Sequence, residues 1–196
     1  MKFFIVAGRP ESGKRDALFA LGNKLVAGGK KGAIILTEKE ENGFDYKNFS
    51  TPDLKVNELF VDCTPCSLRF ILEKMLTKMR DSDFVIIELS GSTLLLETKQ
   101  SLELMKLPNI SFAPIVYFAN AETFRTDIPA YPEFFLAQIR DSNIICINKG
   151  AASEAQIANL HEFLKEHNPD TMILELLSTS DGENYRDLFK LLAVVE

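Results

Sequence analysis

The stretch that decides the fold is residues 2–27, which read KFFIVAGRPESGKRDALFALGNKLVA. It opens with an apolar run of strand length, and a helical stretch closes it before Gly28-Gly29. Between the two lie Gly8-Arg9-Pro10-Glu11-Ser12-Gly13-Lys14, which satisfy the spacing G-x-x-x-x-G-K in the strand-to-helix context that this motif requires. We therefore predict a strand over 2–7, a helix over 14–27 and a phosphate-binding loop between them.

This loop has the chemistry of an anion site. Glycines let the backbone curl closely around a phosphate, so that successive N–H groups and the helix N-terminus face its oxygens. The lysine of the motif neutralises the terminal phosphates. We predict that the loop binds GTP or another nucleotide, and the residues assigned to it are Gly8, Glu11, Ser12, Gly13, Lys14 and Arg15.

The position after the lysine departs from the motif. Ser or Thr belongs there, because its hydroxyl ligates the Mg²⁺ of the nucleotide, whereas this chain has Arg15 followed by Asp16. A guanidinium has donors only, so it cannot ligate a cation. Mg²⁺-dependent hydrolysis is therefore doubtful, and a relic loop that holds sulfate or phosphate but never a nucleotide stays an alternative.

The rest of the chain alternates apolar runs of strand length with longer amphipathic stretches, which is typical of βα units around a parallel sheet. We predict further strands at 32–37, 58–61, 84–88, 112–119, 143–148 and 172–176, and further helices at 67–80 and 153–167. The polar region 38–55 shows no periodicity and is expected to be a functional or mobile loop. The predicted fold class is α/β: a single three-layer P-loop NTPase domain over 1–196, with a mostly parallel open sheet of about seven strands and helices on both faces.

Composition excludes several classes of protein. The 196 residues are 46% hydrophobic and 26% charged, which suits a folded domain and not a disordered chain. The 22 Lys and Arg against 28 Asp and Glu give a net charge of −6, and without a basic stripe this disfavours nucleic acid and membrane as partners. No apolar run approaches the roughly 20 residues of a membrane span, and the N-terminus lacks the pattern of a secretion signal, so we expect a cytoplasmic protein.

A second part of the site is expected at the end of the strand over 84–88. This strand is almost wholly apolar and ends in Glu88, with Gly91 shortly after it. Because ligands bind at the carboxyl ends of parallel strands, Glu88 should meet the phosphate loop there. We predict that Glu88 is catalytic, by holding Mg²⁺ through water or by orienting the attacking water, and that the Gly91 N–H reaches a γ-phosphate.

The strand over 143–148 leads into a segment that is like the start of the guanine-reading element N-K-x-D. We predict that Asn148 and Lys149 of this segment contact the nucleotide. Ala151 stands where the Asp would accept from guanine N1 and N2, so the choice between guanine and adenine stays open. Cys146, within the apolar strand, is expected to be a core thiol.

Cys63 and Cys66 have the C-x-x-C spacing, which can chelate a soft metal or form a redox disulfide. An odd total of 3 cysteines in a reducing compartment favours metal or redox chemistry over structural disulfides. Two thiolates are half of a zinc site, so we predict that the pair binds Zn²⁺ or another transition metal with a further ligand. The candidates for that ligand are Glu58, Asp62, His161 or a residue of a second subunit.

In the order of its elements, the chain resembles the CobW/HypB/UreG family of P-loop GTPases, and the CobW branch in particular. The resemblance rests on the phosphate loop and on segments 56–69, 87–91, 138–149 and 164–169. Within it Lys14 matches the phosphate-loop lysine, Glu88 and Gly91 match the E-x-S/T-G element, and Asn148-Lys149 match the first half of the guanine motif. The resemblance implies a metallochaperone, often a homodimer, that couples GTP binding and hydrolysis to delivery of zinc, nickel or a cobalt-containing cofactor. Its partners would be a nucleotide and a client metalloenzyme or corrinoid protein.

Departures from the family pattern leave the activity open. Arg15 replaces a hydroxyl residue, Ala151 replaces the guanine-reading Asp, and Pro65 replaces the middle Cys of the family's C-x-C-C metal motif. We also expect a member without the separate C-terminal domain of longer CobW proteins. One hypothesis is a delivery GTPase in which Glu38 or Asp45 completes the Mg²⁺ shell. The alternative is a non-hydrolysing pseudo-GTPase that serves as a metal-binding or scaffold partner, and a thiol redox protein is a third hypothesis.

Overall fold

The described part of the chain folds around one sheet of eight strands. The computed structural model describes residues 1–38, 46–59, 65–91, 93–105, 107, 109–130, 132–177 and 182–194. The strands are β1 (Lys2–Gly8), β2 (Gly32–Leu36), β3 (Leu54–Glu58), β4 (Phe84–Leu89), β5 (Ser111–Phe112), β6 (Val116–Asn120), β7 (Ile144–Asn148) and β8 (Met172–Leu176). They run in the order β3-β2-β4-β1-β6-β7-β8, the short β5 pairs with the start of β1, and these pairings are parallel.

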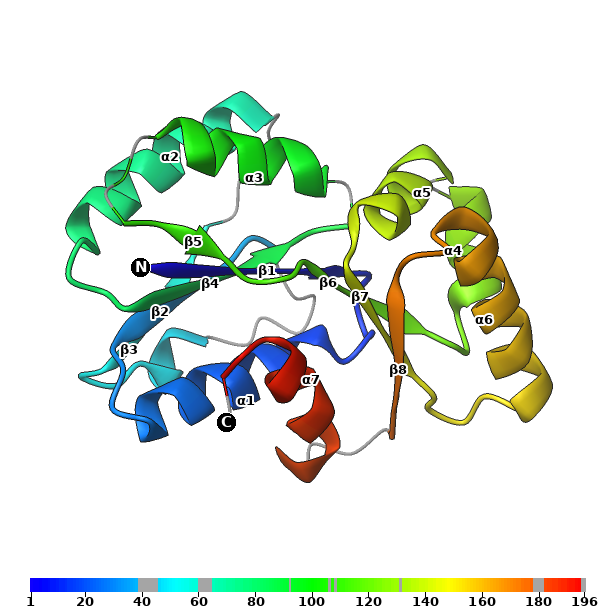
Figure 1. The fold of residues 1–196 in the computed structure, drawn as a ribbon. Helices are drawn as coiled ribbons and strands as arrows, with labels where there is room; N and C mark the ends of the chain where they lie inside the picture. The colour runs from blue at the N-terminus through cyan, green and yellow to red at the C-terminus, as the bar shows by residue number, and fades with distance from the viewer. Residues whose placement is uncertain are drawn as a thin grey trace.

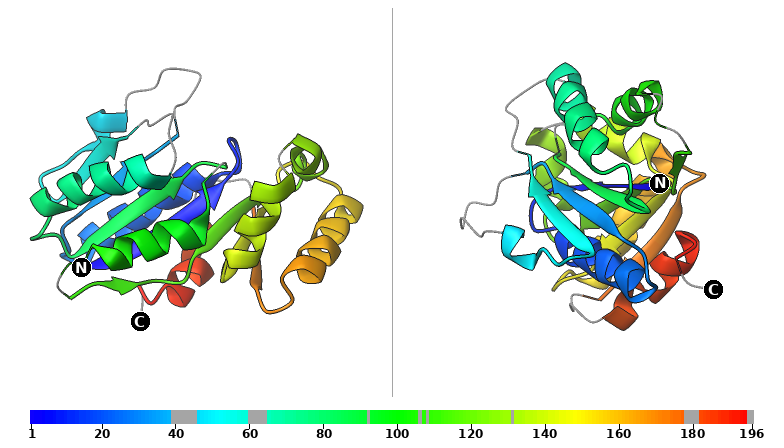
Figure 2. Two further views of the ribbon diagram at one scale, coloured as in Figure 1. Left: turned by 90° about the horizontal axis from the view of Figure 1, so that it is seen from above. Right: turned by 90° about the vertical axis from the view of Figure 1, so that its left-hand side faces the viewer.

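Helices cover both faces of this sheet (Figure 1). One face is covered by α2 (Pro65–Lys78), α3 (Leu95–Leu104), α4 (Phe124–Ala130), α5 (Pro132–Asp141) and α6 (Glu154–His167). The other is covered by α1 (Lys14–Ala27) and α7 (Arg186–Leu191). Two 3-10 turns, η1 (Tyr46–Phe49) and η2 (Gly182–Tyr185), lie in the connections. Figure 2 shows the sheet between the two helix layers, which confirms the predicted three-layer α/β class.

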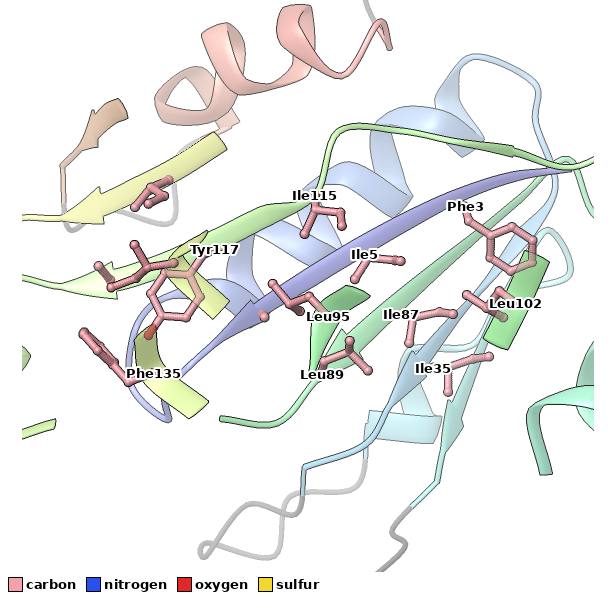
Figure 3. Close-up of a cluster of buried hydrophobic side chains, with 14 of the residues drawn as sticks. Phe3, Ile5, Ile35, Ile87, Leu89, Leu95, Leu102, Ile115, Tyr117 and Phe135 are labelled. Atoms are coloured by element: carbon pink, nitrogen blue, oxygen red, sulfur yellow. The ribbon is translucent and has the colours of Figure 1, made fainter. Parts of the chain in front are cut away.

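The core has two halves because side chains alternate along each strand. On β1, Phe3 and Ile5 enter the cluster under α2 and α3, where Figure 3 shows them near Leu95 and Leu102. The next residue along, Phe4, enters the cluster under α1 and α7. A strand buried on both faces reads as a continuous apolar run, which is why β1 and β4 were found directly from the sequence.

Most of the predicted strands are confirmed with small shifts of their ends, and so is the helix over 14–27. The strand expected at 58–61 was placed wrongly, because β3 runs from Leu54 to Glu58 and pairs Val56 with Ile34 of β2. The end of the region expected to be a loop, 38–55, is therefore strand. The run expected as one strand over 112–119 is divided into β5 and β6. Helices α3, α4, α5 and α7 were not predicted from the sequence.

The described residues contain no helix that is both long enough and apolar enough to cross a membrane.

Candidate functional site

The loop between β1 and α1 lies at the carboxyl edge of the sheet, where the register aligns Gly8 with Phe118 of β6. Gly8 has a φ of 149°, and a Cβ there would lie 2.6 Å from the carbonyl oxygen of Phe118. Gly13, the N-cap residue of α1, has a φ of 84° in the left-handed region. The loop therefore needs glycine at both ends. Between them Glu11 also has a positive φ of 60°, which is uncommon for a residue with a side chain.

Two features suit this loop to an anion. The N-terminus of α1 has no side-chain cap, so its first N–H groups present the positive end of the helix dipole. Ser12 is fully buried, and its Oγ has no hydrogen-bond partner among the described residues. A buried hydroxyl without a partner is destabilising by about 1–3 kcal/mol. A phosphate oxygen held in the loop would provide the missing acceptor, so these residues fit the phosphates of a nucleotide.

Two asparagines at the ends of neighbouring strands hold the loop in place. Asn148 Nδ2 of β7 donates to the Ser12 carbonyl oxygen at 3.3 Å, and Asn120 Nδ2 of β6 donates to the Glu11 carbonyl oxygen at 3.2 Å. The two asparagines are partners in the β6–β7 register. Asn148, predicted to contact the nucleotide, thus contacts the phosphate loop. Asn120 was missed, although a polar residue that ends an apolar strand was an available signal.

Four charged side chains form an ion cluster beside the loop: Lys14, Arg15, Glu38 and Glu88. Lys14 Nζ lies 2.5 Å from Glu38 Oε2 and 3.7 Å from Glu88 Oε1, and it donates to the Arg9 carbonyl oxygen at 3.1 Å. Arg15 holds Glu88 with two donors, Nε at 2.8 Å from Oε1 and Nη2 at 3.2 Å from Oε2. Arg15 Nη2 also donates to the Glu38 carbonyl oxygen.

The ion cluster is almost closed to solvent, and its charges balance. The exposed fractions are 4% for Lys14, 12% for Arg15, 19% for Glu38 and 0% for Glu88. Buried charges are stable only when they are paired, and removal of one partner from a buried pair costs about 3–5 kcal/mol. The two cations and the two carboxylates therefore depend on one another.

Aromatic side chains fix the position of Arg15. Its guanidinium carbon lies 4.8 Å from the ring centroid of Tyr46 in η1, which is a cation–π distance. The Tyr46 ring stacks on Phe19 of α1 at 5.5 Å, and Phe49 lies 5.2 Å from Phe19. This role of Tyr46 was not predicted, since the residue lies in a region of the sequence without periodicity.

A nucleotide-bound Mg²⁺ does not fit those residues of the site that the structure describes. The position of the metal-ligating hydroxyl is taken by Arg15, a residue without acceptor atoms. Glu88, the carboxylate predicted to hold the ion, already accepts two hydrogen bonds from that guanidinium. Of the other predicted ligands, Glu38 pairs with Lys14, and Asp45 lies outside the described residues.

Gly91, two residues after β4, lies next to Arg9 of the phosphate loop. It is buried, and a Cβ at this position would lie 3.0 Å from Cδ of Arg9. Gln138 of α5 holds this turn, because its Nε2 donates to the carbonyl oxygens of Ser90 at 3.0 Å and Thr93 at 2.7 Å. Gly91 is therefore beside the phosphate loop, while its contact with a γ-phosphate stays a prediction.

The segment after β7 has partners that the sequence analysis did not identify. Lys149 Nζ lies 2.5 Å from Glu175 Oε2, and His161 Nε2 lies 2.8 Å from Glu175 Oε1. The hydrogen bond from Lys149 is the main reason that the pKa of the Glu175 carboxyl is below its ordinary value. The N–H of Ala151 donates to Glu122 Oε1 at 2.5 Å. The carboxylate of Glu122, two residues after β6, thus lies beside Ala151.

The predicted metal pair falls mostly outside the described residues. Cys63 is outside them, and Cys66 is part of α2 but its side chain is not described. The residues that the structure does describe contain no group of three or more His, Cys, Asp and Glu that could hold a metal. The cysteine pair therefore stays a prediction. Cys146 is buried in the core, as expected, and burial raises the pKa of its thiol.

The proposed third metal ligands have other positions. Glu58 Oε1 accepts a hydrogen bond from the Tyr46 N–H at 3.3 Å. His161 lies on α6, at the opposite end of the sheet from α2 (Figure 1), and contacts Glu175. Asp62 lies outside the described residues.

The fold and the glycine-rich loop define this chain as an α/β protein of the P-loop NTPase class. It belongs to the CobW/HypB/UreG family: the family described as "CobW/HypB/UreG, nucleotide-binding domain" matches residues 2–175. The curated proteins include no match to the sequence.

Solved structures share the fold at low sequence identity. Zn(II)-bound YjiA GTPase from E. coli is 14% identical with a TM-score of 0.61, and the match covers 90% of this chain and 57% of that one. Hydrogenase maturation factor HypB from Archaeoglobus fulgidus is 17% identical with a TM-score of 0.64, over 97% and 89% of the two chains. HypB from Helicobacter pylori in complex with nickel is 13% identical with a TM-score of 0.59, over 97% and 86%. The chain thus spans little more than half the length of the YjiA GTPase.

Proposed function

We propose that this protein binds a GTP-like nucleotide on its phosphate loop and assists the delivery of a metal or a metallocofactor, such as cobalamin or another corrinoid, to a client protein. The main support for nucleotide binding is the conformation of the phosphate loop. It combines two conformationally required glycines, an uncapped helix N-terminus and a buried Ser12 hydroxyl without a partner among the described residues. Each of these is accounted for by a bound phosphate.

The delivery part of the proposal rests on the family and on its relatives. One structural neighbour is a GTPase with bound Zn(II), and another is a hydrogenase maturation factor of which a homologue was solved with nickel. In this chain Cys63 and Cys66 would hold such a metal as cargo, because C-x-x-C thiolates suit soft metals.

A second candidate function is favoured by one contact, in which Arg15 donates two hydrogen bonds to Glu88. Glu88 is the carboxylate that hydrolysis would need, either for Mg²⁺ or for the attacking water. A protein that keeps this carboxylate bound to a guanidinium would act as a non-hydrolysing pseudo-GTPase, a metal-binding or scaffold partner of a metalloenzyme or corrinoid protein.

Calorimetric titration of the metal-free protein with GTP, GDP, ATP and ADP tests the nucleotide part. We expect saturable binding of at least one of these nucleotides, and its loss in Lys14→Ala. Lys24→Ala, on the exposed side of the same helix, is the matched control and should bind as the unaltered protein does. Absence of binding to all four nucleotides by a folded protein would refute the proposal.

Titration with Zn²⁺, Ni²⁺ and Co²⁺ tests the metal part. Cys66→Ser should lose the bound ion, and Cys146→Ser should keep it, because Cys146 is fully buried in the core. Equal binding by the two variants would refute the assignment of the cysteine pair. Phosphate release measured on the nucleotide-bound protein separates the delivery GTPase from the non-hydrolysing alternative.

A further inference from the structure

We propose that the Arg15 guanidinium takes the place of the nucleotide's Mg²⁺, so that this site binds its nucleotide without a divalent cation. This inference rests on the proposed function, since it concerns how the same loop holds the phosphates. It follows from the position of Arg15, from the charge balance around it and from the contacts that hold its side chain.

Arg15 occupies the motif position of the residue that ligates the metal. Arg15 directly follows Lys14 in the first turn of α1, where a hydroxyl would otherwise direct Mg²⁺ between the phosphates and the carboxylate at the end of a neighbouring strand. Here that carboxylate is Glu88, and the guanidinium itself bonds both of its oxygens, at 2.8 and 3.2 Å. The guanidinium therefore already bridges to the carboxylate that the ion would reach. Arginine is also well suited to phosphate, because its permanently charged guanidinium forms strong hydrogen bonds to phosphate oxygens.

The charge balance opposes a divalent ion. Lys14 and Arg15 neutralise Glu38 and Glu88 in the nearly solvent-free ion cluster. Arginine does not lose its proton in proteins. An added Mg²⁺ would therefore be repelled by the permanently charged Arg15 guanidinium that is bonded to Glu88. Entry of the ion requires displacement of Arg15 from Glu88, and the displaced guanidinium would lose both of its hydrogen bonds to that carboxylate. Binding of the nucleotide as a metal-free anion leaves this pair intact.

The side chain is already ordered for this role. Tyr46 packs against the guanidinium with 4.8 Å between the guanidinium carbon and the ring centroid, and Phe19 stacks on Tyr46. The Glu38 carbonyl oxygen accepts a further hydrogen bond from Nη2. A side chain fixed in this way loses little conformational entropy when a ligand binds.

The test is the dissociation constant for GTP measured by calorimetry in EDTA and in excess Mg²⁺, for the unaltered protein and for Arg15→Thr. For the unaltered protein we expect Mg²⁺ to weaken binding, or at most to strengthen it by less than about tenfold, because the ion competes with the site for metal-free GTP. Arg15→Thr restores the hydroxyl of the motif and removes the blocking charge. This variant should bind at least about tenfold more weakly in EDTA, and Mg²⁺ should restore its affinity. Arg140→Thr, an exposed position on α5, is the control and should match the unaltered protein.

Arg15→Thr leaves Glu88 buried without its main partner and can fail to fold. The double variant Arg15→Thr/Glu88→Gln removes both charges of the pair and keeps the test decisive. It should bind GTP weakly in both conditions, because it has neither the guanidinium nor the carboxylate that would hold Mg²⁺. Circular dichroism establishes that each variant is folded.

The outcomes separate the two claims. Binding by the unaltered protein that strengthens more than about tenfold on addition of Mg²⁺ would overturn the inference and leave the proposed function standing. Binding in EDTA that is unchanged in Arg15→Thr, or in the double variant if the single one does not fold, would overturn the inference as well. Absence of GTP binding by the unaltered protein in both conditions would overturn the proposed function and the inference together.

Discussion

We expect Glu38 to compete with the nucleotide for the phosphate-loop lysine, so replacing it should strengthen nucleotide binding. Its Oε2 lies 2.5 Å from Lys14 Nζ, the group that neutralises the terminal phosphates in this motif. A triphosphate must therefore displace the Glu38 carboxylate before it can reach the lysine. Glu38→Gln keeps the size of the side chain and removes its charge, which weakens the competitor without opening a cavity.

The size of the effect follows from the burial of this pair. Lys14 is 4% exposed and Glu38 is 19% exposed, so solvent screens their attraction only in part. A hydrogen bond to a charged group is worth about 1.5–3 kcal/mol net. A neutral Gln retains some of this by accepting from Lys14, so we expect a gain of about 1–2 kcal/mol in binding, or roughly 5- to 30-fold in affinity. Lys14 stays paired with Glu88 at 3.7 Å, so the variant should fold.

The assay is calorimetric titration of GTP into the unaltered protein, Glu38→Gln and the control Glu162→Gln on the exposed side of α6. We expect tighter binding by Glu38→Gln alone. Denaturant unfolding without nucleotide should show a loss of stability for this variant, up to about 3 kcal/mol, since the buried lysine has lost a charged partner and keeps only a neutral acceptor there. Affinity that is unchanged or weaker in Glu38→Gln would refute the competition, because it would mean that the carboxylate is not in the path of the phosphates.

Three further predictions concern the loop, the surface and the core. Gly8→Ala should lower the free energy of unfolding by at least about 1–3 kcal/mol, because the φ of 149° is strained for a side chain and its Cβ would contact the Phe118 carbonyl oxygen. Glu175→Gln should cost less than about 1 kcal/mol at neutral pH, since the ion pair with Lys149 is partly exposed. Because that pair lowers the pKa of Glu175 below 4.5 in the folded state, its stabilisation is present above this pH and should disappear as the pH falls through the folded value. Ile87→Ala, at a fully buried position, should cost about 2–5 kcal/mol.

Denaturant unfolding measures all three variants. A Gly8→Ala protein of unchanged stability would contradict the backbone argument. A difference for Glu175→Gln that grows in acid would contradict the sign of the pH dependence. A loss below about 1 kcal/mol for Ile87→Ala would show that the core around β4 is not packed as described.

The sequence predicted the centre of the fold well, because local signals determine it. The strand, the loop and the helix over 2–27 carry a motif, a periodicity and a glycine stop that agree with one another. The edge strand β3 was misplaced because only Leu54 and Val56 of its residues are buried, so its apolar signal is weak.

The interior of the candidate site was less predictable, since its contacts join residues far apart in the chain. Arg15 and Glu88 are 73 positions apart, and Asn120 and Glu11 are 109 apart. The prediction that the loop and Glu88 lie at one edge of the sheet was correct, because parallel strands place their carboxyl ends together. The bond between Arg15 and that carboxylate was not predicted, since local sequence patterns do not determine which distant partner a long charged side chain reaches.

The most direct test of the account is a crystal structure of the protein with a non-hydrolysable GTP analogue, grown in the presence of Mg²⁺. We expect the phosphates within the loop 8–14, a phosphate oxygen within hydrogen-bond distance of Ser12 Oγ, and Arg15 still on Glu88 with no metal between them. An analogue bound elsewhere would contradict the assignment of the site. A Mg²⁺ ion held by Glu88 with Arg15 turned away would contradict the role given to the guanidinium.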